Sequence, residues 1–450
     1  MKAGGADDTI AAVVTAEGRG AIAVIRVSGP GAFEIVKRHV DQWPREHRRA
    51  TLCTLRDSEG EILDEALVTT FIAPFSFTGE DVVELGTHGG RVVPTLVLAA
   101  LISSGARMAL PGEFTRRAVL NGKLDLVQAE AVGDLVDSTS RAMQRVAVAQ
   151  LDGGLSRRID ALRERVIDLE ALIAYDIDFP EEDDGPIPRA RIASVMQEVL
   201  DSLDALLATA PAGELVRAGA LVVIAGAPNV GKSSLFNAML GRARAIVTEV
   251  PGTTRDAIEA VLDAGEWPIR LVDTAGLRET SDVVEQLGIE VARQYLESAD
   301  VVLACGETAD EAMRVRDVVS ATSAAPIIRV RTKADLHPIA SGEAGLSSVS
   351  ATTGTGVREL LDDIASAISE RYGGVTLDAP VLTRERQRFC VELARSEMEQ
   401  FALALDGEEL PASVAAVHLR SAANALAEVT GTIDVEDVLD HLFRTFCVGK

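Results

Sequence analysis

The segment Gly226-Ala-Pro-Asn-Val-Gly-Lys-Ser233 has the residue types and spacing of a phosphate-binding loop. It follows an apolar stretch, 221–225, that is predicted to be a strand, and it opens a predicted helix at 233–240. Glycines let backbone N–H groups curl around phosphate oxygens, and the start of a helix adds partial positive charge. We expect Lys232 to reach the β- and γ-phosphates of a nucleotide and the hydroxyl of Ser233 to bind Mg²⁺.

Two later motifs favour GTP over ATP. Asp273-Thr-Ala-Gly276 ends a predicted strand, where a carboxylate can hold the magnesium shell and the backbone N–H of Gly276 can meet the γ-phosphate. Thr332-Lys-Ala-Asp335 ends another predicted strand. The carboxylate of Asp335 can accept two hydrogen bonds, from N1–H and the exocyclic amine of guanine, which adenine does not offer in that form.

Two further segments complete the predicted nucleotide site. Ser350-Ala-Thr352 can offer backbone contact to the oxygen of the base. Gly252-Thr-Thr-Arg-Asp256 lies between the first two motifs, and we expect Thr254 to be a second magnesium ligand on a mobile switch loop.

The predicted site lacks one familiar hydrolytic group. Leu277 follows Gly276 where Ras-type enzymes carry the glutamine that orients the attacking water. Another group must position that water; Glu285 in the acidic segment 280–290 is a candidate, and a solvated surface glutamate is the plainer alternative. Asn229 can place its amide oxygen near the β–γ bridge, where a monovalent cation would supply the charge that an arginine finger supplies elsewhere.

The elements that must position these residues change in kind along the chain. Residues 1–122 combine apolar strands at 21–27 and 67–72 with a helix at 92–103, which is an α+β pattern. From 123 the pattern is helical, and an acidic break at 176–185 precedes a second helix at 189–208. Apolar residues at steps of four and three predict one packed helix face before the break: Leu155, Ile159, Leu162, Val166, Leu169 and Ile173.

The nucleotide motifs lie in a third region, 218–373, that predicts a P-loop, Ras-like α/β domain with helices on both faces of a parallel sheet. Its predicted strands are 221–225, 269–272, 301–304, 327–330 and 346–349. Helical pattern returns in 374–450, with Leu439, Leu442 or Phe443, and Phe446 on one face. The α/β domain is therefore predicted to be inserted into a discontinuous helical-bundle domain made of 123–217 and 374–450.

The length, composition, cysteine spacing and net charge of the chain limit the class of protein to which it can belong. The chain has 450 residues, of which 47% are hydrophobic and 25% charged, an ordinary globular composition for about three domains. Cys53, Cys305, Cys390 and Cys447 are widely spaced, which favours a reduced cytoplasm over disulfides or zinc. We expect a cytoplasmic protein without a membrane segment or secretory signal. A net charge of −25 argues against binding nucleic acid over the whole surface.

Distinctive motifs also lie outside the nucleotide site, in all three regions. They are Gly18-Arg-Gly-Ala-Ile-Ala-Val-Ile-Arg-Val-Ser-Gly29, Phe77-Thr-Gly-Glu-Asp-Val-Val-Glu-Leu85, His88-Gly-Gly90, Pro111-Gly-Glu-Phe-Thr115, Asn121-Gly-Lys-Leu-Asp-Leu126, Gln128-Ala-Glu-Ala131, Ile177-Asp-Phe-Pro180 and Cys447-Val-Gly-Lys450. In these motifs and their order, the whole chain resembles the bacterial tRNA modification GTPase family MnmE, also called TrmE.

The resemblance implies that the domain at 1–122 binds 5-formyltetrahydrofolate or a related one-carbon folate and forms a homodimer. It also implies a heterotetramer with an FAD-binding partner, MnmG (GidA). That complex adds an aminomethyl or carboxymethylaminomethyl group to C5 of the tRNA wobble uridine, with the folate as the source of the one-carbon unit. Potassium-stimulated GTP hydrolysis, dependent on dimerisation of the G domains, would drive these domains together and apart.

Individual roles also follow from the resemblance. Glu285 acts on the attacking water, and Cys447 is required for the modification. The implied folate contacts are Arg26, Glu84, Lys123 and Lys450. The implied metal ligands are Ser233 and Thr254 for magnesium, and Asn229, Thr248, Val250 and Thr253 for potassium. The nucleotide and its cations are expected to contact Asn229, Val230, Gly231, Lys232, Ser233, Ser234, Thr248, Glu249, Val250, Pro251, Gly252, Thr253, Thr254, Asp273, Thr274, Ala275, Gly276, Thr332, Lys333, Ala334, Asp335, Ser350, Ala351 and Thr352.

Without the resemblance, three of these residues have plainer interpretations. Arg26 ends a strand and could be a surface charge, and Glu84 could face outward from a strand. Lys450 could belong to a frayed tail.

The chain departs from the family pattern at the guanine motif. Thr332 stands where the family usually has Asn, which removes a side-chain amide that braces the base and the phosphate loop. A hydroxyl can replace part of that bracing, so we predict weaker nucleotide binding with guanine preference kept through Asp335. Cys305-Gly-Glu307 stands where related GTPases commonly carry an Asp, and no consequence follows from the sequence. Val448 replaces the usual Ile, a small apolar change.

Two other classes remain open at this point. A ribosome-assembly GTPase shares the motifs at 226–233 and 252–256, but it has no reason to carry the motifs before 131 or the tail at 447–450. Thr332 motivates the second alternative, a folate-binding scaffold with a decayed GTPase. Such a protein would hydrolyse no GTP in potassium or sodium.

The net negative charge of the chain leads us to expect that tRNA binds largely to the partner protein. Limited contacts would come from Arg116, Arg117 and Lys123.

Overall fold

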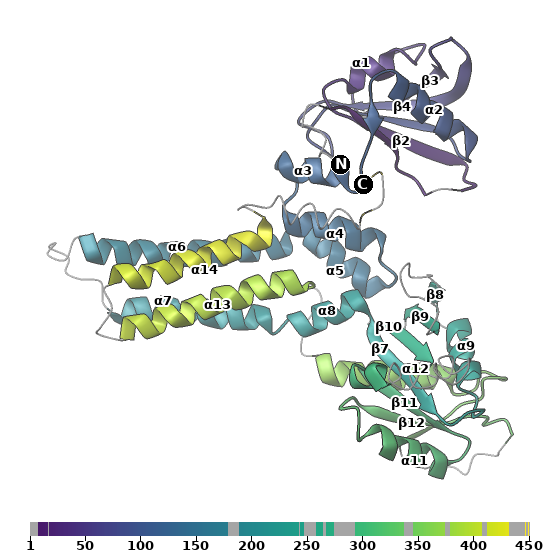
Figure 1. Ribbon diagram of the computed structural model, residues 1–450, viewed down its shortest axis with the longest axis vertical. Coiled ribbons are helices and arrows are strands. Elements are labelled where there is room, and N and C mark those ends of the chain that lie inside the picture. Colours follow the sequence, from purple (N-terminus) through teal and green to yellow (C-terminus); the bar gives the residue numbers. More distant parts are fainter. Residues whose placement is uncertain are drawn as a thin grey trace, which may run out of the picture. The chain divides into compact units, whose positions relative to one another are not determined.

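Figure 1 shows the computed structural model of the chain. It describes residues 8–16, 18–178, 189–242, 244–246, 258–263, 267–273, 293–336, 345–373, 379–406, 412–431, 446 and 449. The chain divides into two compact units, of which one is Met1–Gly133 with Thr430–Lys450 and the other is Asp134–Val429. The domain boundaries predicted at 122, 217 and 373 stay predictions.

The first unit is built on a six-stranded sheet with the strand order β3-β4-β5-β2-β1-β6. Neighbouring strands are antiparallel except for β1 and β6. The strands are β1 (Ile10–Val13), β2 (Ile22–Ser28), β3 (Thr51–Arg56), β4 (Ile62–Phe71), β5 (Val82–His88) and β6 (Arg107–Met108). The helices are α1 (Ala32–Lys37), α2 (Val92–Ser103), α3 (Glu113–Leu120) and α4 (Leu126–Val136), and the unit boundary crosses α4.

Alternating side chains on this sheet separate its apolar core from its opposite face. Ile25 and Val27 on β2 and Leu85 on β5 are fully buried, and they share a core with residues of α2. Arg26 and Glu84 stand between them in sequence and therefore point to the other face of the sheet. The predicted strands at 21–27 and 67–72 and the predicted helix at 92–103 are confirmed.

The second unit contains helices from two separate parts of the chain. They are α5 (Arg141–Leu151), α6 (Gly154–Asp178), α7 (Arg189–Leu207), α8 (Ala210–Ala218), α13 (Glu385–Asp406) and α14 (Ala412–Thr430). The six apolar residues predicted to share one face of α6 are all buried, which confirms that prediction. Within the described ranges, no helix combines the length and apolarity needed to cross a membrane.

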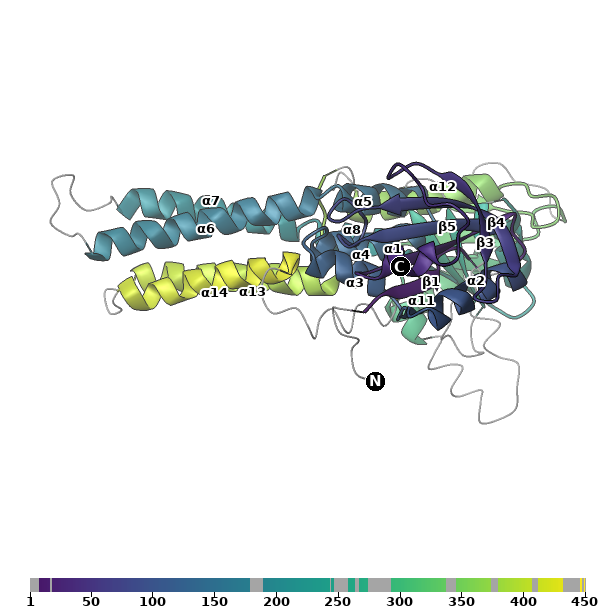
Figure 2. The same ribbon diagram turned by 90° about the horizontal axis from the view of Figure 1, so that it is seen from above.

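The early and late helices lie side by side in Figures 1 and 2, with α13 along α7 and α14 along α6. An ion pair between Arg395 and Asp204 joins the first two helices. Arg420 and Glu170 join the second two, with 2.8 Å between nitrogen and oxygen. The discontinuous helical bundle expected from the sequence is therefore present.

The nucleotide motifs lie on a seven-stranded sheet with the order β13-β12-β11-β7-β10-β9-β8. Its strands are β7 (Ala220–Gly226), β8 (Arg244–Ile246), β9 (Ile258–Asp263), β10 (Pro268–Asp273), β11 (Val301–Gly306), β12 (Ile327–Arg331) and β13 (Leu346–Ser348). Its helices are α9 (Lys232–Arg242), α11 (Ala309–Val319) and α12 (Val357–Tyr372). The five predicted strands are confirmed. The prediction of a parallel sheet is wrong at one edge, where β8 and β9 add antiparallel pairs. The link from β9 to β10 has too few residues for the crossover that two parallel strands need.

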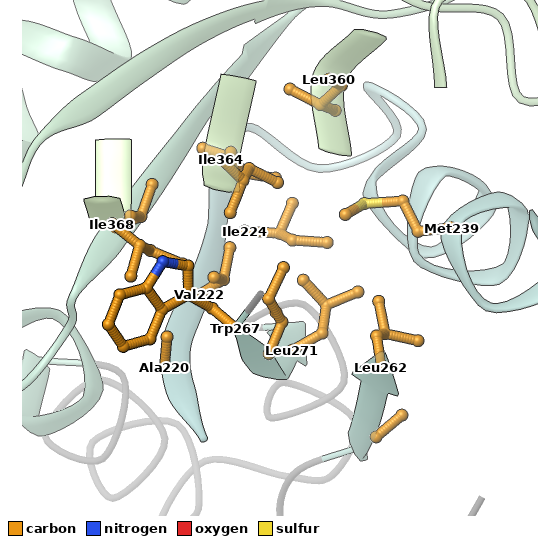
Figure 3. Close-up of a cluster of buried hydrophobic side chains, with 14 of the residues drawn as sticks. Ala220, Val222, Ile224, Met239, Leu262, Trp267, Leu271, Leu360, Ile364 and Ile368 are labelled. Carbon is orange, nitrogen blue, oxygen red and sulfur yellow. The ribbon is translucent and has the colours of Figure 1, made fainter. Parts of the chain in front are cut away.

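Helices cover both faces of this sheet. In Figure 3, Val222 and Ile224 of β7 lie near Leu360, Ile364 and Ile368 of α12. On the other face, a second cluster packs β7 and β11 against residues of α11. Burial on both faces explains why β7 and β11 are continuously apolar rather than alternating.

The two chain segments that lead into and out of this sheet meet at one carboxylate. Asp134 accepts hydrogen bonds from Arg217, just before β7, at 3.2 Å, and from Arg384, just before α13, at 2.7 Å. The amide of Gln150 on α5 donates to the carbonyl of Val381 at 3.1 Å. This junction is what an inserted domain requires, since its ends must return to the same place.

Candidate functional site

The loop between β7 and α9 has the shape of an anion cradle. Residues 220–225 of β7 are buried, and α9 begins directly after Gly231. Asn229 is exposed and has a φ of 63°, a left-handed conformation that Asn adopts more readily than most residues. The loop therefore turns sharply just before the helix N-terminus, where unpaired N–H groups favour a phosphate.

Lys232 is folded over this loop. Its side chain is 5% exposed, and its ammonium donates to the carbonyls of Gly226 at 3.0 Å and Ala227 at 2.8 Å. A buried ammonium needs such acceptors, and phosphate oxygens are stronger ones because they are charged. The ammonium of Lys232 therefore already lies beside the position where a nucleotide's phosphates would bind.

Ser233 and Asp273 form an oxygen pair beside the loop. The Ser233 hydroxyl donates to Asp273 Oδ2 at 2.7 Å, and Asp273 is 1% exposed at the end of β10. Hydroxyl and carboxylate oxygens are the hard ligands that Mg²⁺ prefers, so the residues present fit this ion. The carboxylate also orients the hydroxyl, which leaves its lone pairs for a metal.

Thr332 links the guanine motif to the phosphate loop. Its hydroxyl is buried and lies 2.5 Å from the carbonyl of Val230 and 3.2 Å from that of Gly306. A hydroxyl has one proton, so it can donate to only one of these carbonyls at a time. The shorter distance favours Val230, and no donor of Thr332 is then left for a base.

A pocket of about 310 Å³ lies between these motifs. Asp335 is exposed at its wall, and the hydroxyl of Ser350 donates to Asp335 Oδ1 at 2.6 Å. The lining residues are Gly231, Ser234, Leu235, Thr332, Lys333, Asp335, Leu336, Val349, Ala351 and Thr352. The pocket has an anionic acceptor at one side and apolar walls, which suits a flat base with adjacent N–H donors.

Several predicted site residues lie outside the described residues. They are Thr248, Glu249, Val250, Pro251, Gly252, Thr253, Thr254, Thr274, Ala275, Gly276, Glu285, Cys447 and Lys450. Among the other predicted nucleotide contacts, the structure brings Ser233 against Asp273 and gathers Gly231, Ser234, Thr332, Lys333, Asp335, Ala351 and Thr352 around one pocket. Their roles stay predictions.

A second polar site lies in the first unit. Arg26 and Glu84 are direct cross-strand neighbours on β2 and β5, and Nε and Nη2 of Arg26 lie 2.9 and 2.8 Å from one carboxylate oxygen. The guanidinium carbon is 5.2 Å from the ring centre of Phe77 and 5.6 Å from that of Phe114. Arg26 is therefore neither a strand-end residue nor an isolated surface charge, and Glu84 does face outward from a strand.

A buried charge network that sequence reasoning missed supports this second site. Arg117 is 6% exposed and pairs with Glu80 at 3.0 Å and Glu113 at 3.2 Å, while Glu80 accepts from the Ser28 hydroxyl at 2.7 Å. Burial raises the pKa of Glu113, but hydrogen bonds, chiefly from Arg107, outweigh it and hold that pKa below its ordinary value. The charged residues of this network are dispersed along the sequence, so no local pattern indicated it. Arg117 is thus unavailable for the expected tRNA contact.

The C-terminal tail is anchored on the first unit at two described residues. The ring of Phe446 packs on α4, where a Cβ at Gly133 would lie 3.0 Å from it. Gly449 is buried with a φ of 102°, and a Cβ there would lie 2.7 Å from the carbonyl of Val13 at the end of β1. Only glycine fits such a left-handed, close approach. Phe446 and Gly449 are therefore both held against the first unit, whereas Cys447, Val448 and Lys450 lie outside the described residues.

The phosphate loop, the oxygen pair and the guanine-type pocket meet at one edge of an α/β sheet, which defines the chain as a P-loop GTP hydrolase. Two family models match it: the MnmE helical domain over residues 126–447, and the GTP-binding protein TrmE N-terminus over residues 9–123. The chain belongs to the MnmE family of tRNA modification GTPases.

Curated relatives agree along nearly the whole chain. The tRNA modification GTPase MnmE of Akkermansia muciniphila is 43% identical, over 98% of this chain and 99% of the relative. The proteins of the same name from Heliobacterium modesticaldum and Aquifex aeolicus are 42% and 39% identical, again over 98% of this chain. Among solved structures, the G domain of the Thermotoga maritima FeoB iron transporter is 28% identical, covers 32% of this chain and 96% of its own, and has a TM-score of 0.26.

Thr332→Asn should tighten GTP and GDP binding by about fivefold, the worth of one added neutral hydrogen bond. Asparagine has two amide protons and an acceptor, so it can keep the bond to Val230 and still face the base. Calorimetry with both nucleotides measures the change. Thr332→Val is the matched control, because it removes the hydroxyl at nearly constant shape and should weaken binding. Equal affinity of Thr332→Asn and the wild-type protein would refute the idea.

Proposed function

We propose that this GTPase drives the modification of the tRNA wobble uridine. With the FAD-binding partner MnmG (GidA) in a heterotetramer, it adds an aminomethyl or carboxymethylaminomethyl group to C5 of that base. The family supports tRNA modification, and the observation that carries the finer proposal is the Arg26–Glu84 site in the unit without nucleotide motifs. An assembly GTPase would have no use for a second polar site of this kind.

In the proposed hydrolysis, Lys232 exchanges its two carbonyl partners for β- and γ-phosphate oxygens. Mg²⁺ held by Ser233 and Thr254 would offset charge on those oxygens. Asp273 orients Ser233, and Glu285 positions the attacking water. The proposed potassium ligands are Asn229, Thr248, Val250 and Thr253. The exposed, left-handed Asn229 supports this proposal, because the residue is open to solvent rather than packed in the core.

The proposed folate site uses Arg26, Glu84 and Lys123. A pterin ring offers adjacent N–H donors, as guanine does, so a carboxylate such as Glu84 can accept from it, and the planar guanidinium of Arg26 can stack on it. Bound folate would supply the one-carbon unit. The residues present fit such a group, since Glu84 is 30% and Arg26 20% exposed and both are reachable from solvent. Lys123 is exposed, and its stem lies 3.2 Å from a Cβ built on Gly79.

The docked tail supports a role for Cys447 and Lys450 at the same site. Gly449 contacts Val13 and Val14 at the end of β1, and β1 pairs with β2 beside Arg26. Cys447 precedes this anchor by two residues and Lys450 follows it by one. On this ground we propose that Cys447 supplies the required thiol and that Lys450 is the last folate contact.

The proposed homodimer uses the outer face of the N-terminal sheet. Leu52 on β3 and Leu67 on β4 are register partners, 58% and 50% exposed, and Ile22 on β2 is 66% exposed. These side chains share a face with Arg26 and Glu84, because all stand an even number of residues apart along their strands. A second copy of the chain on this apolar face would lie next to the folate site.

The proposed tRNA contact is limited, because the chain carries a net charge of −25. With Arg117 buried in ion pairs, Arg116 and Lys123 remain as proposed contacts. Most of the RNA would then lie on MnmG, whose binding should set the salt dependence of the complex.

Cells that lack this chain should lose the wobble modification from their tRNA. The wild-type gene should restore it, whereas Cys447→Ser and Gly449→Ala copies should not, because one removes the thiol and the other undocks the tail. Nucleoside mass spectrometry of purified tRNA measures the modification. The same purified variants should hydrolyse GTP at the wild-type rate.

Gly60→Ala is a matched control for Gly449→Ala. Gly60 also has a positive φ, 86°, but a Cβ there would meet nothing within 4 Å, so this variant carries backbone strain without lost docking. It should restore modification. Unchanged tRNA in cells without the chain, accompanied by incomplete ribosomal subunits, would replace the proposal with an assembly function.

A further inference from the structure

Glu307 lies outside every nucleotide motif, in the short connection between β11 and α11. Its carboxylate forms an ion pair with the ammonium of Lys333, the second residue of the guanine motif. Glu307 is fixed from its own side as well, because its backbone N–H donates to Glu311 Oε2 at 2.9 Å. Thr308 caps α11 by accepting from the Glu311 N–H at 3.2 Å. The connection is thus rigid where it presents the carboxylate.

Lys333 is held in an unusual conformation by its neighbours. Its φ is 54°, in the left-handed region that lysine rarely adopts. The next N–H, of Ala334, donates to the carbonyl of Val349 at 3.1 Å, and that of Thr332 donates to Gly306 at 2.9 Å. These bonds direct the Lys333 side chain back across the phosphate loop, where its Cε lies 3.9 Å from a Cβ built on Gly231.

The lysine stem therefore forms one wall of the nucleotide pocket, and Glu307 holds its far end. A free lysine side chain has several rotatable bonds, and ordering it on binding costs affinity. An ammonium that is already paired is ordered before the nucleotide arrives.

We infer that Glu307 is a positioning residue for guanine nucleotides: it holds Lys333 over Gly231 so that the pocket is formed before binding. This bracing matters here because the single proton of Thr332 is committed to Val230 or Gly306. The inference accounts for the segment Cys305-Gly-Glu307, to which the sequence alone assigned no consequence.

A double-mutant cycle on the full chain tests the inference. Dissociation constants for GDP are measured by calorimetry for the wild-type protein, Glu307→Gln, Lys333→Gln and the double variant. Glu307→Gln should weaken GDP binding by about fivefold, the size of one partly exposed charge pair, with kcat at saturating GTP unchanged. In the Lys333→Gln background, adding Glu307→Gln should change nothing, because Glu307 acts only through Lys333.

Inosine diphosphate separates this role from base recognition. It lacks the exocyclic amine from which Asp335 would accept a hydrogen bond, so it should bind more weakly than GDP. Glu307→Gln should nevertheless weaken the binding of both nucleotides by the same factor. Asp310→Asn removes a neighbouring negative charge from the start of α11 and should leave both constants unchanged. Glu307→Asp should bind GDP more tightly than Glu307→Gln, since it keeps the charge.

Melting temperatures show that the variants are folded. An equal loss of affinity from Glu307→Gln with and without Lys333 would overturn the inference, because Glu307 would then act by another route. Unchanged GDP affinity in a folded Glu307→Gln variant would overturn it as well.

Discussion

Asp335→Asn should lower the affinity for GTP by roughly a thousandfold or more and create affinity for xanthosine triphosphate. In the variant, an N–H donor of asparagine faces the N–H donors of guanine, and a mismatch of polar groups at a site built for hydrogen bonds costs factors of this size. This is the largest effect that we expect from a single substitution in the nucleotide site.

The geometry of Asp335 explains why the base is exchanged rather than simply lost. Ser350 donates to Asp335 Oδ1 at 2.6 Å, so the carboxylate is held in one orientation at the wall of the pocket. An amide in its place offers an N–H donor where guanine presents its own amine. Xanthine has a carbonyl oxygen at that position, which accepts from the new amide.

Competition between guanine and xanthine nucleotides measures this exchange directly. Ser350→Ala is the matched control: it removes the group that orients the carboxylate but leaves the acceptor, so it should weaken GTP binding without creating xanthine binding. If Asp335→Asn bound GTP as the wild-type protein does, the pocket beside Thr332 and Ala351 would not be the base site.

Lys232→Ala should reduce GTP hydrolysis by about a hundredfold or more. The ammonium of Lys232 is the charged donor that is placed in advance beside the phosphate loop, and removing one such preorganised donor typically costs this much in rate. Alanine also leaves the carbonyls of Gly226 and Ala227 without the charged donor that they now share. A modest loss of nucleotide affinity should accompany the loss of rate.

Phosphate release measured in potassium chloride and in sodium chloride tests this prediction together with the proposed cation site. The wild-type protein should be faster in potassium, and the difference should disappear in Lys232→Ala, because the remaining rate no longer depends on an ordered γ-phosphate. Lys37→Ala, which removes an exposed lysine from the first unit, should behave as the wild type. Absence of hydrolysis by the wild-type protein in either salt would instead indicate a decayed GTPase.

The sequence was sufficient for features that are encoded locally. The buried face of α6 follows from six apolar residues at helical spacing, and the central strands of the nucleotide sheet follow from short apolar runs before turn residues. The phosphate loop also depends on one contiguous segment. Each of these could be predicted because a few neighbouring residues determine the conformation.

Features that depend on distant partners could not be predicted in this way. Arg26 and Glu84 meet only because β2 pairs with β5 in one register, and a shift by one residue would turn them to the core. Glu307 meets Lys333 only because β11 and β12 end at the same edge of the sheet. The antiparallel edge of β8 and β9 was missed because nothing in their composition reveals strand direction.

The junction at Asp134 has a consequence for synthesis of the chain on the ribosome. Helices α6 and α7 emerge early, but their partners α13 and α14 are encoded beyond the whole nucleotide domain. At about 5–20 residues per second, the face of α7 that packs on α13 waits on the order of ten seconds or more for its cover. During that interval it is an exposed surface that a nascent-chain chaperone could bind. Rapid folding of the inserted domain would bring its two ends together and so shorten the distance over which Arg384 must move to pair with Asp134.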